Sequence, residues 1–133
     1  MCPYIHEHII KSELESQETI LFIVSHLCFV GLGGCIRYGT HGPYNVMVIQ
    51  LLGHSLQDMF RAAATKTFSV RICLKLAEQA LDRLETLHKC GILHRDIKPA
   101  NFVMGRGRMS EVLYLIDFGL SKFYLDSEGH HIP

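Results

Sequence analysis

Two short segments of the chain combine side chains that can bind a metal ion and move a proton. They are HRDIKPAN at residues 94–101 and DFG at residues 117–119. The carboxylate and amide oxygens in these segments are the hard ligands that Mg²⁺ prefers. A carboxylate can also accept the proton of a hydroxyl group, and the compact charge of Lys98 suits a phosphate oxygen. These residue types indicate metal-assisted phosphoryl transfer, which needs positioning and charge neutralisation.

The order and spacing of the two segments match the protein-kinase motifs H-R-D-x-x-x-x-N and D-F-G. On that match, Asp96 accepts or orients the hydroxyl proton and Lys98 contacts the transferred group. Asn101 belongs to the same catalytic loop, and Asn101 and Asp117 are the predicted ligands of Mg²⁺. A lysine two residues after the catalytic aspartate resembles serine/threonine kinases rather than tyrosine kinases.

Each of these residues also has a simpler interpretation. Asp117 alone is a candidate cap for the segment that follows it, and Lys98 alone is typical of a solvated charge. His94 is predicted to be structural and to pack beneath the D-F-G turn. Arg95 is either a solvated charge or the hydrogen-bonding partner of a buried carboxylate. The joint occurrence of both motifs favours the functional interpretation of Asp117 and Lys98.

A long helix is predicted immediately before the first motif, over residues 69–90. Apolar residues recur there at three- and four-residue spacing, which gives one apolar face. The members of this face are Ile72, Leu76, Ala80, Leu84 and Leu87. Ser69 is placed to cap the start of the helix, and Gly91 is placed to end it in a left-handed conformation.

The remaining elements are shorter. They are a helix over 7–24, strands over 35–39 and 46–52 joined by a turn at 40–43, a short helix over 55–60 capped by Ser55, and strands over 102–104 and 112–116. The order of helix, hairpin, long helix and hairpin predicts a mixed α+β fold rather than a wound parallel sheet.

Composition restricts the classes of partner. Lys and Arg number 13, Asp and Glu also number 13, and apolar residues make up 48% of the 133 residues. A balanced charge gives no reason to expect nucleic acid as a partner. The five cysteines are odd in number and lack C-x-x-C spacing, which favours a reducing, cytoplasmic or nuclear compartment.

Residues 19–36 contain no formally charged side chain, which raises the question of a membrane helix. Ser25, His26 and three glycines near one end argue against a membrane span, and no basic cluster marks a flank. The sequence therefore favours a buried helix end that runs into a buried strand.

Beyond the two motifs, the chain resembles the casein kinase 1 family of serine/threonine protein kinases from about residue 35 to its end, and the tau-tubulin kinases are similar over the same stretch. The resemblance rests on YNVMVIQLLG at 44–53, HSLQDMF at 54–60, FVMG at 102–105, LSK at 120–122 and HIP at 131–133. The family usually has proline at the position of His54. The resemblance implies ATP and a Ser/Thr-containing protein substrate as partners.

The resemblance also implies a nucleotide pocket. Ile49 is the expected gatekeeper, Gln50 and Leu52 offer backbone groups to adenine, and Asp58 reaches the ribose. Val103 forms the floor beneath the base, and Ile116 lines the back of the pocket. Without the family, the three apolar members are ordinary core residues, and Asp58 is a solvated carboxylate at a helix start.

Departures from the family pattern leave a second interpretation open. No G-x-G-x-x-G or V-A-I-K segment is present. Lys11 is the only lysine before Lys66, and it resembles a family lysine that lies two residues before the ion-pairing glutamate of the first helix. On that match Glu13 is the ion-pairing glutamate, with Glu15 as the alternative. We therefore expect a partial kinase domain, with residues 1–52 as the end of the N-lobe and the start of the hinge, and 53–133 as the start of the helical C-lobe. On this view the isolated chain transfers phosphate poorly or not at all. The alternative is a non-catalytic, pseudokinase-like binding module.

Overall fold

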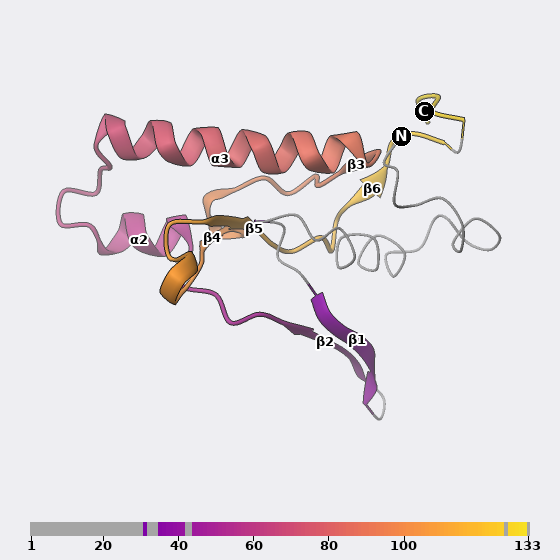
Figure 1. Cartoon of the computed structure of the whole chain (residues 1–133), viewed down its shortest axis with the longest axis horizontal. Helices are drawn as coiled ribbons and strands as arrows, with labels where there is room; N and C mark the ends of the chain where they lie inside the picture. The colour runs from indigo at the N-terminus through magenta and orange to yellow at the C-terminus, as the bar shows by residue number, and fades with distance from the viewer. Residues whose placement is uncertain (1–30, 32–34, 42–43, 127, 133) are drawn as a thin grey trace.

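A computed structural model describes residues 31, 35–41, 44–126 and 128–132 (Figure 1). The predicted helix over 7–24, with Lys11, Glu13 and Glu15, lies outside these residues, as does most of the apolar stretch 19–36. Within the described part of the chain, no helix combines the length and apolar character needed to cross a bilayer. Helices and small antiparallel sheets alternate along the chain, which confirms the predicted α+β class.

The first described element is a hairpin of β1 (Cys35–His41) and β2 (Tyr44–Ile49), paired antiparallel. Both strands are predicted by the sequence, but β2 ends before the predicted residue 52. The reason is a change of hydrogen-bonding partner. The N–H of Gly53 donates to the carbonyl of Met104 at 2.7 Å, so the chain has left β1 and runs along a second hairpin.

The long helix α3 (Val70–Lys89) confirms the prediction over 69–90. The Ser69 hydroxyl accepts from a first-turn N–H, and Gly91 follows the helix with a φ of 74°, a left-handed value that favours glycine. Ile72, assigned to the apolar face, is instead 46% exposed. The face that packs on the core begins one turn later, at Leu76.

The second hairpin pairs β4 (Phe102–Met104) with β5 (Leu113–Leu115), as predicted. Residues 53–55 run along the other edge of β4, where Met104 donates to the carbonyl of His54 at 3.0 Å. Figure 1 shows α3 on one side of this hairpin and the β1–β2 hairpin on the other. The β4–β5 pair therefore occupies the centre of the molecule.

A third pair joins β3 (Ile92–Leu93) to β6 (Lys122–Phe123) and is not predicted by the sequence. Two-residue strands carry no periodic pattern, so only tertiary contacts reveal them. This pair anchors both ends of the stretch that holds the 94–101 and 117–119 segments. It thereby brings the two motifs together.

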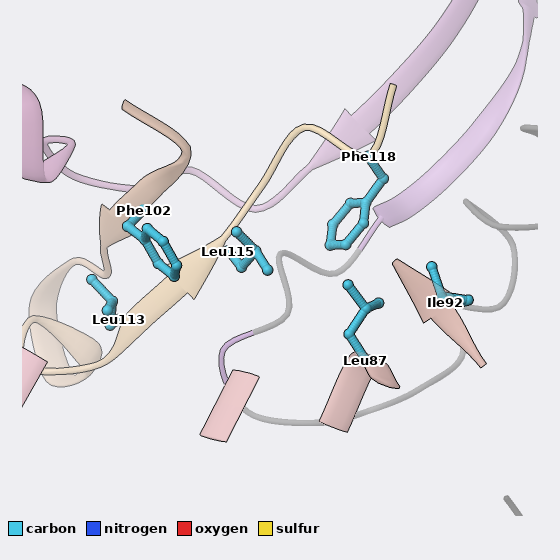
Figure 2. Packing of buried hydrophobic residues seen from close by; sticks show 6 residues of the cluster. All are labelled: Leu87, Ile92, Phe102, Leu113, Leu115 and Phe118. Atoms are coloured by element: carbon cyan, nitrogen blue, oxygen red, sulfur yellow. The ribbon is translucent and has the colours of Figure 1, made fainter. Parts of the chain in front are cut away.

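One buried apolar cluster joins the long helix to the second and third strand pairs (Figure 2). Its members are Leu87, Ile92, Phe102, Leu113, Leu115 and Phe118. They come from α3, β3, the β4–β5 hairpin and the D-F-G segment. Burial of apolar area is the main favourable term in folding, so the same contacts that stabilise the chain also fix the positions of the two motifs.

Candidate catalytic site

His94 fixes the start of the 94–101 loop. Its side chain is buried, and its ring centroid lies 5.1 Å from that of Phe118. Nδ1 accepts the N–H of Asp96 at 3.2 Å, so Nε2 carries the proton and donates to the carbonyl of Ile116 at 2.9 Å. This arrangement confirms the predicted structural role of His94, which links the loop to the 117–119 segment.

Asp96, Lys98 and Asn101 form one hydrogen-bonded network. Lys98 Nζ donates to Asp96 Oδ2 at 2.5 Å. Asn101 Nδ2 donates to the same Oδ2 and to the backbone carbonyl of Asp96, both at 2.9 Å. A 3₁₀ turn, Pro99–Asn101, brings the asparagine back toward the aspartate. The amide nitrogen is committed to Asp96, and no residue in the described part of the chain donates to the amide oxygen of Asn101, which can therefore serve as a metal ligand.

The network also sets the charge of Asp96. The hydrogen bond from Lys98, followed by that from Asn101, lowers the pKa of the Asp96 carboxyl below its ordinary value of 3.8, and partial burial opposes the shift. The carboxylate is therefore ionised at neutral pH. An ionised, partly exposed carboxylate can orient a hydroxyl group and accept its proton.

Asp117 lies next to this network because the two segments share a backbone hydrogen bond. The N–H of Ile116 donates to the carbonyl of Asn101 at 3.0 Å. Asp117 is exposed and has a φ of 65°, and its Oδ1 accepts from the N–H of Gly119 at 3.3 Å. A left-handed aspartate costs on the order of 1 kcal/mol or more, and such strain clusters at functional sites. The chemistry of the donor set, carboxylate plus amide oxygen, fits Mg²⁺.

Arg95 was predicted either as a solvated charge or as the partner of a buried carboxylate, and the structure does not show the second role. Its Nε donates to the backbone carbonyl of Leu120 at 2.5 Å. Within the described residues it forms no ion pair. Arg95 has a left-handed φ of 64°, and its side chain reaches the segment after the D-F-G motif. Arg95 therefore connects the two loops through a backbone carbonyl rather than through a charge.

A cleft of about 450 Å³ adjoins this network, within the size range of small-molecule sites. Its lining residues are Ile49, Leu52, Gly53, Ser55, Gln57, Asp58, Ala100, Val103 and Ile116. The predicted nucleotide-binding residues are all present except Gln50. Ala100 and Ile116 directly precede Asn101 and Asp117, so the predicted metal ligands lie beside the wall of the cleft.

Four lining residues were not predicted: Gly53, Ser55, Gln57 and Ala100. A Cβ on Gly53 would lie 3.0 Å from the carbonyl oxygen of Gly105, so glycine is what allows this segment to approach the second hairpin closely. The sequence marks Ser55 only as a helix cap. The position of Ala100 next to Asn101 is the one signal that could have placed it in the site.

Comparison with known protein families places the chain in one of them. The model of the protein kinase domain family matches residues 8–131, which is nearly the whole chain. The matched region includes both motifs and every residue that lines the cleft. The chain therefore belongs to the protein kinase domain family.

Proposed function

We propose that this kinase is a serine/threonine protein kinase of the casein kinase 1 type, which transfers the γ-phosphoryl group of ATP to protein serine and threonine. One observation carries the phosphoryl-transfer part of the proposal: the Asp96–Lys98–Asn101 network lies next to the cleft. A carboxylate, a cation and an amide group thus meet next to Ala100, which lines a cleft with room for a nucleotide.

The walls of the cleft suit adenine and ribose. Ile49, Val103 and Ile116 supply apolar surface for the flat base. Leu52 lies at the hinge and offers backbone groups to the edge of adenine. Gln50 is assigned the same backbone role, although its side chain does not line the cleft. Asp58 is assigned to the ribose hydroxyls.

The catalytic loop supplies the groups that act on the phosphates and the acceptor. Mg²⁺, when bound, neutralises charge on the phosphate oxygens. Asn101 and Asp117 are its proposed ligands. Lys98 donates to an oxygen of the group in transfer, and Asp96 orients the acceptor hydroxyl. The hydroxyl oxygen forms a bond to the γ-phosphorus, the bond from that phosphorus to the bridging oxygen breaks, ADP leaves, and the proton passes to Asp96.

Support for serine and threonine as acceptors comes from Lys98, two residues after the catalytic aspartate. Support for the casein kinase 1 type comes from the hinge and post-D-F-G segments, 44–53 and 120–122. These segments are similar to that family. Both finer assignments rest on resemblance, whereas the kinase fold rests on the family match.

The first test is Mg²⁺-dependent ATP binding by the 133-residue chain, measured by calorimetry. We expect saturable binding that Asp117→Asn abolishes, because an amide cannot replace the anionic ligand. Asp82→Asn on the exposed side of α3 is the matched control and should bind as the parent does. Absence of binding by a parent chain that is folded by circular dichroism would contradict the proposal.

The second test identifies the acceptor. Peptides that differ only in a central Ser, Thr or Tyr are incubated with the chain and γ-labelled ATP, and the phosphorylated residue is identified. Even slow transfer suffices, since the type of residue modified is the readout. We expect phosphoserine and phosphothreonine. Phosphotyrosine would contradict the serine/threonine assignment.

A further inference from the structure

The start of α2 (Leu56–Ala62) contains a closed pair of side chains at the wall of the cleft. The hydroxyl of Ser55 accepts the N–H of Asp58 at 3.1 Å and donates to Asp58 Oδ2 at 2.6 Å. The backbone N–H of Ser55 donates to the same Oδ2 at 3.2 Å. Ser55 itself is only 9% exposed. This reciprocal arrangement is a capping box.

The capping box gives the two oxygens of the Asp58 carboxylate different hydrogen-bonding environments. Oδ2 receives both donors of Ser55, whereas no described residue donates to Oδ1. Asp58 lines the cleft, and Ser55 anchors it from a segment that pairs with β4. The hydrogen bonds from Ser55 also lower the pKa of the Asp58 carboxyl, so Oδ1 belongs to an ionised group.

We propose that Ser55 is a positioning residue for sugar recognition. By holding Oδ2 with two donors, it fixes the rotamer of Asp58 and leaves Oδ1 to accept a hydrogen bond from a ribose hydroxyl. The inference rests on the proposed ATP site and adds a determinant of nucleotide specificity to it. Without the Ser55 hydroxyl, Oδ2 keeps only the longer hydrogen bond from the backbone N–H of Ser55, so the Asp58 carboxylate is held less firmly and its contact with the sugar loses its fixed geometry.

The test compares the Kd of ATP with the Kd values of 2′-deoxyATP and 3′-deoxyATP, all with Mg²⁺. A hydrogen bond from a hydroxyl to a charged acceptor corresponds to a preference of roughly tenfold or more for the nucleotide that has it. We expect the parent chain to show this preference against one deoxynucleotide. Asp58→Ala should reduce the ratio of Kd values to near one.

Two variants of Ser55 separate positioning from capping. Ser55→Asp keeps an acceptor for the N–H of Asp58, since aspartate is a good cap, but it cannot donate to the Asp58 carboxylate. Ser55→Thr keeps both functions. We expect the preference for ATP over the deoxynucleotide to disappear in Ser55→Asp and Ser55→Ala and to persist in Ser55→Thr. Circular dichroism verifies the fold of each variant.

The outcomes are distinct. If the parent binds neither ATP nor the deoxynucleotides, the proposed ATP site and this inference both fail. If Asp58→Ala abolishes the preference while Ser55→Ala and Ser55→Asp preserve it, the ATP site stands and the positioning role of Ser55 is wrong. If Asp58→Ala preserves the preference, the sugar is recognised elsewhere, and the inference is overturned.

Discussion

Asp96 receives hydrogen bonds from Lys98 and Asn101 on one carboxylate oxygen, and the first of these contributes most to its low pKa. Lys98→Met removes that donor. We expect the pKa of Asp96 to rise toward 3.8 in the variant, as measured by NMR titration of the side-chain carboxyl carbon. Lys89→Met, which removes the exposed Lys89–Glu85 ion pair on α3, is the control and should leave Asp96 unchanged.

Asp96 also makes the stability of the fold depend on pH, and the direction of this dependence follows from the shift of its pKa. The folded pKa of Asp96 lies below the value of about 3.9 expected in an unfolded chain. Its ionised form therefore stabilises the fold fully above that pH, and the contribution is lost as the pH falls through the folded pKa. The Lys98→Met variant should lose less stability over this acid range than the parent. An equal loss in both chains would argue that other carboxyls control acid unfolding.

At the level of elements, one glutamine connects α3 to the second hairpin. Gln79 Nε2 donates to the carbonyl of Glu111 at 3.0 Å, and its Oε1 accepts the N–H of the buried Leu113 at 2.9 Å. Gln79→Ala leaves that N–H without a partner. We expect the free energy of unfolding to fall by about 1–3 kcal/mol and the Leu113 amide proton to exchange faster. The neighbouring Glu78→Ala is the exposed control, and unchanged exchange at Leu113 would contradict the assigned role.

The elements also show which features of the fold a local sequence pattern can predict. The helix α3 was predicted because its signal, a 3.6-residue period with a serine cap, is contained within the helix. The β3–β6 pair and the edge pairing of residues 53–55 were missed, since they depend on contacts between distant segments. In the site, motif spacing predicted Asp96, Lys98 and Asn101, which the structure brings together. Small lining residues such as Gly53 and Ala100 have no chemical signal of their own.

At the scale of the whole molecule, stability and catalytic geometry depend on one core. Figure 2 shows Phe118 of the D-F-G segment in the same cluster as Leu87 of α3 and Leu115 of β5. His94 packs on Phe118 and bonds to the carbonyl of Ile116, so the catalytic loop rests on that cluster. A substitution in the core should therefore destabilise the entire fold, whereas a substitution on the outer side of α3 should have little effect on stability.

Two leucines of α3 allow this contrast to be measured within one helix. Leu87 is 0% exposed in the core, and Leu81 is 66% exposed on the outer side. The two Leu→Ala changes have the same small effect on helix propensity, so the difference between them isolates burial. We expect Leu87→Ala to lower the free energy of unfolding by about 2–5 kcal/mol and Leu81→Ala by about 0.5 kcal/mol or less, by urea titration monitored by circular dichroism. Comparable losses would mean that Leu81 is covered in solution, and that the face of α3 that carries it is not an outer surface.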